Sequence, residues 1–83
     1  MARAHLGESA DLFVGIARRR ADVRERILAT LGDGRPRGRR ALMAQAGIPL
    51  DEATTVLLVL HELTNAGRVL RGGALYALPA SAA

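Results

Sequence analysis

Arginine is the residue type in this sequence whose spacing most directly suggests chemistry. The chain has 83 residues, its 12 basic residues are all arginines, and with 8 acidic residues they give a formal net charge of +4. A dense group occupies residues 35–40, beside the expected start of a short helix. Guanidinium groups and the free N–H groups of a helix N-terminus both bind phosphate. We therefore expect phosphate contacts from this group, Arg35, Arg37, Arg39 and Arg40; a solvated surface is the alternative interpretation.

The remaining polar residues do not suggest catalysis. His5 and His61 are the only histidines and lie far apart without a third ligand in helical register, so a zinc site is not expected. No serine, histidine and acid are grouped together, and no glycine-rich loop is followed by a lysine. The chain has no cysteine, which excludes a disulfide or a thiolate metal site. We expect no enzyme activity, no cofactor and no small-molecule substrate.

The chain is expected to form one domain, because a chain this short buries only roughly 60% of its unfolded surface. Its longest apolar stretch, residues 56–60, is far below the roughly 20 residues of a membrane span. A signal-peptide pattern is absent, so we expect a cytoplasmic protein with no membrane partner. Two aromatic residues, Phe13 and Tyr76, are too few to stack single-stranded bases.

We expect a helical extension over residues 1–20, a domain over residues 21–79 and a disordered tail over residues 80–83. Ser9 is a candidate cap for the extension, whose apolar face carries Leu12, Phe13 and Ile16. Asp22 and Glu25 have capping-box spacing for a second helix, which Gly32 would end. A single helix over residues 9–31 is the alternative, since nothing between the two pieces forces a break.

Further along, the pattern predicts two helices and a hairpin. A short helix follows the basic loop and closes at Gly47, and a longer one spans about residues 51–66 and stops at Gly67. Its core face carries Val56, Val59, Leu60 and Leu63. Two short extended runs flank Gly72 and Gly73, which are expected at a two-residue turn that pairs Val69 with Tyr76 and Leu70 with Leu75.

This order of elements, mainly α with a small β-hairpin, resembles a winged helix-turn-helix domain with an extra N-terminal helix. The resemblance covers residues 22–79. It rests on apolar and turn residues at family spacing: Leu42, Gly47, Ile48, Pro49, Val56, Leu60, Leu63, Gly67 and Val69. Bacterial and phage regulators share this spacing, as does the C-terminal winged-helix domain of DNA-processing proteins of natural transformation.

The resemblance implies double-stranded DNA as a partner, with the third helix in the major groove. Thr54, Thr55 and His61 would then reach base edges, and Arg68 and Arg71 of the hairpin would join the arginines of residues 35–40 on phosphates. This predicts a small DNA-binding protein, a transcriptional regulator acting as a dimer.

One departure from the family pattern supports an alternative. Residues 51–67 contain no arginine but three acids, and Leu57 and Leu58 stand where polar readers are usual. Exposed leucines need a cover, either the N-terminal extension of the same chain or a second molecule, a copy of itself or a larger protein. The alternative is a protein–protein interaction module, and the expected dimer or partner interface comprises Leu12, Phe13, Ile16, Leu57, Leu58, Leu70 and Leu75.

Overall fold

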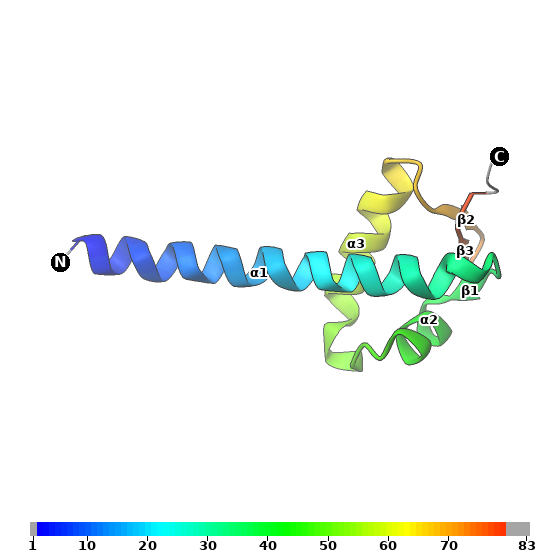
Figure 1. Ribbon diagram of the computed structural model, residues 1–83, viewed down its shortest axis with the longest axis horizontal. Helices are drawn as coiled ribbons and strands as arrows, with labels where there is room; N and C mark the ends of the chain where they lie inside the picture. The colour runs from blue at the N-terminus through cyan, green and yellow to red at the C-terminus, as the bar shows by residue number, and fades with distance from the viewer. Residues whose placement is uncertain (1, 80–83) are drawn as a thin grey trace.

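The computed structural model describes residues 2–79, with side chains described from residue 13 onward. Its elements are, in chain order, α1 (Ala2–Thr30), η1 (Leu31–Asp33), β1 (Arg37–Gly38), α2 (Arg39–Ala46), η2 (Leu50–Glu52), α3 (Ala53–Asn65), β2 (Leu70–Gly72) and β3 (Leu75–Ala77). α2 and α3 pack against the C-terminal half of α1, whose N-terminal half projects away from the domain (Figure 1). The longest dimension of the molecule, 53 Å, follows this helix.

The first helix is continuous, so the prediction of two pieces is wrong and the single-helix alternative is closer. α1 spans 29 residues, and both Ser9 and Asp22 lie inside it rather than at a cap. Extending a helix adds a hydrogen bond with each residue, whereas starting a new one requires an unfavourable nucleus. The sequence between the two expected pieces consists of arginine and alanine, which favour helix. The chain turns only after η1, at Gly34, which has a φ of 80°.

The core is formed by one face of each helix and by the hairpin. α1 contributes Val23 and Ile27 and η1 contributes Leu31, each at most 1% exposed. The predicted core face of α3 is confirmed, and the buried side chains among the described residues are Val23, Ile27, Leu31, Leu42, Met43, Ile48, Val56, Val59, Leu60, Leu63, Val69 and Tyr76. Among the described residues no charged side chain is buried, so burial of apolar surface stabilises this fold.

Glycines end the second and third helices as predicted. Gly47 has a φ of 70° and Gly67 a φ of 72°, a left-handed conformation that residues with a Cβ rarely adopt. Arg26 of α1 donates hydrogen bonds to the carbonyl oxygens of Ala46 and Gly47 at 3.4 and 3.5 Å. The end of α2 is thereby fastened to α1.

The sheet has the strand order β1-β3-β2, and both pairs are antiparallel. The predicted hairpin is present, but the predicted register is wrong. Arg71 pairs with Tyr76 and Leu70 with Ala77, and the turn lies at Gly73, whose φ is 62°. Val69 stands before β2 and is buried in the core. β1 was not predicted; it pairs with β3 on the side opposite to β2, and this contact from a distant part of the chain helps to fix the register.

Candidate nucleic-acid interface

The sheet brings the start of α2 next to the wing, the hairpin of β2 and β3. Arg39 and Arg40 are the first residues of α2 and directly follow β1, while Arg71 lies in β2. The three arginines, together with Gly38, Ala74 and Tyr76, line one shallow hollow. All three are exposed. We call Arg39, Arg40 and Arg71 the basic surface. The start of α2 and the hairpin, which were predicted separately to contact phosphate, lie side by side in it.

Two contacts within the wing hold the side chain of Arg71 in position. Its Nε donates a hydrogen bond to the carbonyl oxygen of Gly73 at 3.1 Å. Its guanidinium carbon lies 5.9 Å from the ring centre of Tyr76, a side chain that is only 8% exposed. A cation over an aromatic face is attracted by the electrons of the ring. The contact fixes the guanidinium without engaging its terminal N–H groups, which can donate to a phosphate.

A second hollow lies on the other side of Arg71, between the wing and α3. Arg71 and Tyr76 line it together with residues of α3, namely Leu57, Leu60, His61 and Thr64. Arg71 thus stands between the start of α2 and the outer face of the third helix. A ligand crossing the basic surface would also meet α3.

The outer face of α3 is mixed in character. Thr54 and His61 are exposed, as are Leu57 and Leu58 at 42% and 45%. His61 is engaged with its own helix, since its Nε2 lies 3.2 Å from the side-chain amide nitrogen of Asn65. Thr55 is half-buried. Base contacts by Thr54, Thr55 and His61 stay a prediction, in which Thr55 is the least accessible of the three.

Two acidic residues, Glu52 before α3 and Glu62 within it, are paired with arginines of α1. Arg19 forms an ion pair with Glu52. The carboxylate of Glu62 forms ion pairs with the terminal guanidinium nitrogens of Arg24 at 3.5 Å and of Arg20 at 3.8 Å. Exposed pairs of this kind contribute little to stability, about 0–1 kcal/mol each. They nevertheless direct two negative charges toward α1. Of the three acids that the sequence places in residues 51–67, Glu52 and Glu62 are compensated by arginines of α1.

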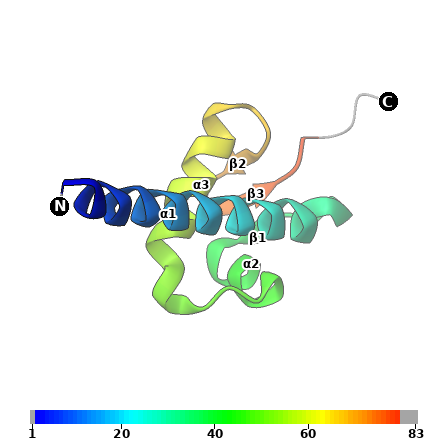
Figure 2. The same ribbon diagram turned by 60° about the vertical axis from the view of Figure 1, so that its left-hand side comes forward.

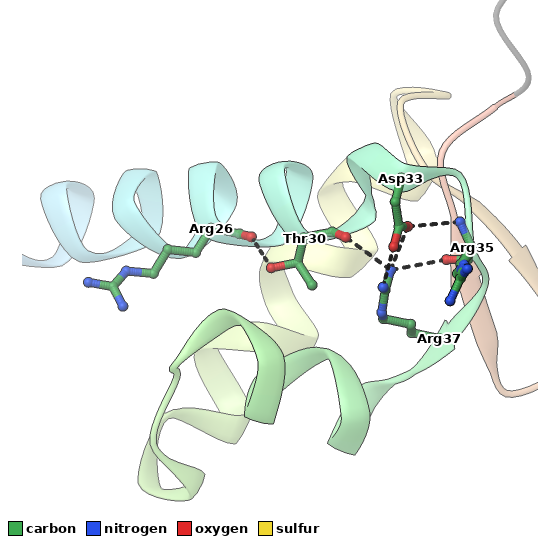
Figure 3. A network of polar contacts seen from close by, with 5 residues as sticks. All are labelled: Arg26, Thr30, Asp33, Arg35 and Arg37. Carbon is green, nitrogen blue, oxygen red and sulfur yellow. Dashed lines mark hydrogen bonds and ion pairs between the residues drawn. The ribbon is translucent and has the colours of Figure 1, made fainter.

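Arg37 has a different environment from the other arginines in residues 35–40. It donates to Asp33 Oδ1 at 2.8 Å and to the carbonyl oxygen of Thr30 at 2.9 Å, and it forms an ion pair with Asp33 through its second terminal nitrogen (Figure 3). Its side chain is 13% exposed. Arg37 therefore connects the end of α1 to β1, and we leave it out of the basic surface.

The Asp33–Arg37 contact predicts an acid-sensitive contribution to stability. The hydrogen bonds from Arg37, and then the N–H of Arg35, hold the pKa of Asp33 well below its usual range. A carboxylate with a lowered folded-state pKa stabilises the fold above its unfolded pKa of about 4, and this contribution is lost as the pH falls further. We expect Asp33→Asn to be less stable than the wild type at pH 7 and to lose part of the acid dependence.

Urea unfolding between neutral and acid pH measures this effect. The control is Asp22→Asn, which removes a carboxylate from an i,i+4 pair with Arg26 at 3.0 Å in which both side chains are about half exposed. We expect the control to follow the wild-type pH dependence closely. Parallel curves for wild type and Asp33→Asn would show that the contact has no role in acid unfolding.

Of the two alternatives for covering the leucines, the N-terminal extension of the same chain does not provide the cover. Phe13 and Ile16 remain 71% and 44% exposed because α1 continues straight past the domain and carries them away from it. Leu70 and Leu75 of the wing are 55% and 47% exposed. The side chain of Leu12 lies outside the described residues.

Two further arginines that were predicted to contact phosphate, Arg35 and Arg68, are exposed and lie in the connections that precede β1 and β2.

Comparisons of this chain with protein-family models, with curated proteins and with solved structures give no match. The class rests on topology: three helices followed by a small antiparallel hairpin, consistent with a winged-helix-like fold. Within residues 2–79, none of the helices combines the length and apolar character needed to cross a bilayer.

Proposed function

We propose that this protein binds double-stranded DNA, as a small winged-helix transcriptional regulator of bacterial or phage type. The observation that carries the proposal is the position of Arg71, which lies in one hollow with Arg39 and Arg40 and in the adjoining hollow with α3. In winged-helix proteins the wing, the start of the second helix and the third helix all face the duplex. Here these three elements form one continuous surface with exposed guanidinium groups.

The binding is mainly to phosphate. Arg39, Arg40 and Arg71 each present charged donors, and the N-terminus of α2 adds oriented N–H groups beside the first two. Arg35 and Arg68 are candidates for outer contacts. Contacts to phosphate position a protein on the duplex without reading its sequence. Base reading is limited to Thr54, Thr55 and His61, and Leu57 or Leu58 could contact a thymine methyl group.

The test is fluorescence anisotropy with a labelled duplex of random sequence over a series of salt concentrations. Each neutralised phosphate contributes about −0.9 to the slope of log affinity against log salt, so three contacts give a slope of about −2.7. A slope of this size or steeper supports the proposal. Absence of binding at the lowest salt concentration contradicts it.

The second candidate function is a protein-interaction module that uses the outer face of α3 and the wing. The exposed leucines favour it: Leu57, Leu58, Leu70 and Leu75 are 42% to 55% exposed within a small domain. In this case duplex DNA does not bind, and Leu58→Asp disrupts association while the monomer remains folded. Sedimentation velocity of wild type and variant, with circular dichroism to check folding, measures both.

A further inference from the structure

The apolar side of α1 continues past the edge of the domain. Ile16 lies about two helical turns before Val23, and Phe13 lies about four helical turns before Ile27. All four residues therefore share one side of the helix. Val23 and Ile27 are 1% and 0% exposed in the core. Ile16 and Phe13 on the same side are 44% and 71% exposed. The blue N-terminal half of α1 projects beyond α2 and α3 in Figure 1, and Figure 2 shows from a view turned by 60° that α3 crosses α1.

A groove follows this side of α1 where the helix leaves the domain. Its outer end is apolar, lined by Phe13, Ile16 and Ala17, and its inner end is lined by Arg20, Arg24 and Glu62. Both arginines pair with the single carboxylate of Glu62 at 3.8 and 3.5 Å, so the inner end keeps a net positive charge. The side chains of Arg20 and Arg24 are 42% and 37% exposed, which leaves them accessible to an acidic partner.

The order of charges along α1 is complementary to the basic inner end of this groove. Glu8 and Asp11 precede Phe13, whereas Arg18, Arg19 and Arg20 follow Ile16. We propose that the groove receives the N-terminal half of α1 from a second copy of this chain, running antiparallel. This orientation places Phe13 beside the partner's Ile16 and brings the acidic stretch of each copy to the basic end of the other's groove. A parallel pair would bring the arginines of both copies together instead.

The stability of the projecting helix supports the same conclusion. Residues 2–18 extend for about 25 Å at the helical rise per residue, in the half of α1 that projects from the domain (Figure 1). Helices of this size are marginal in water, and Gly7 and Gly15 weaken this one further. An antiparallel partner buries the apolar side of both helices and stabilises each. The proposal concerns a surface separate from the basic surface and does not depend on DNA binding.

The first experiment compares Ile16→Asp with Val14→Asp by sedimentation equilibrium. Val14 is exposed to a similar extent, 48%, but lies about 160° around the helix from Ile16. The wild type is expected to be a dimer, Ile16→Asp to dimerise about 30-fold or more weakly, and Val14→Asp to dimerise like the wild type. Val14→Asp should retain the wild-type circular dichroism, whereas Ile16→Asp should keep the cooperative unfolding of the domain and lose only helical signal from the projecting half of α1.

Three results would overturn the proposal. They are a monomeric wild type throughout the micromolar range, equal weakening by Ile16→Asp and Val14→Asp, and a dimer that Leu58→Asp disrupts but Ile16→Asp does not. The last result would place the contact on α3 instead of α1.

The second experiment measures the orientation. The chain contains no cysteine, so Ala29→Cys introduces one spin-label site on an exposed position of α1. An antiparallel pair centred between residues 14 and 15 separates the two labels by about 43 Å along the helix axis. In a parallel pair only the interaxial distance of about 8–10 Å and the label linkers separate them. A double electron–electron resonance distance of about 40–50 Å confirms the antiparallel pair, and one below about 25 Å contradicts it.

Discussion

Replacing Arg39, Arg40 and Arg71 together by alanine is expected to weaken binding to duplex DNA by several hundred-fold at about 0.1 M salt. Loss of three phosphate contacts removes about 2.7 from the log-log salt slope, which corresponds to roughly 500-fold at this concentration. The loss should be the same for every duplex sequence, since phosphates carry no sequence information. All three side chains are exposed, so the variant should remain folded. Anisotropy over a salt series, with circular dichroism on the same samples, measures both quantities.

Single substitutions provide the matched control. Arg71→Ala removes the guanidinium that stands between α2 and α3, whereas Arg18→Ala removes one of equal charge from an exposed position on α1. We expect the salt slope to fall by about 0.9 for Arg71→Ala and to change little for Arg18→Ala. If the two variants behave alike, the positive charge acts as a diffuse field and the basic surface is not the binding site.

Replacing Ile27 by alanine is expected to lower the free energy of unfolding by about 2–5 kcal/mol. Ile27 is 0% exposed and packs in the core, and its truncation leaves a cavity that α2 and α3 can fill only in part. A small domain has a total stability of about 5–15 kcal/mol, so this one change removes a large share. Urea unfolding followed by circular dichroism gives the value directly.

Ile16→Ala is the control for that experiment. It removes the same atoms from the same side of the same helix, but at a position that is 44% exposed. At protein concentrations low enough to keep the chain monomeric, we expect a change of at most about 0.5 kcal/mol. Equal destabilisation by the two substitutions would contradict the boundary of the core along α1.

The parts of the fold that could be predicted are those with local signals. The apolar face of α3 repeats at the helical period, and Gly47 and Gly67 stand where each helix ends. Other features depend on contacts between distant segments. The two-residue strand β1 is too short to show an alternating pattern, and its pairing with β3 cannot be seen in either segment alone. Without it, the turn is predicted one residue too early and the strand partners two residues out of register.

The candidate site was predictable as a group of arginines but not residue by residue. Composition does not distinguish Arg37 from Arg39, because the difference lies in a carboxylate four residues before Arg37. The spacing of four residues between Asp33 and Arg37 is a readable signal for pairing, which separates Arg37 from the rest of the basic run at residues 35–40. The partners of Arg20 and Arg24 lie on α3, so only the folded chain brings them together.

The shortness of strand β1 also implies that the proposed binding face is locally less stable than the core. Arg39 follows β1, Tyr76 lies in β3 and Arg71 in β2, so the three strands that hold these groups contain only two or three residues each. Small sheets open in local fluctuations that need less free energy than global unfolding. Amide protons of residues 37–38 and 75–77 should therefore exchange with solvent together and faster than those of Ile27 or Leu60. The core can stay folded while the face that carries the arginines adjusts to the curvature of its ligand.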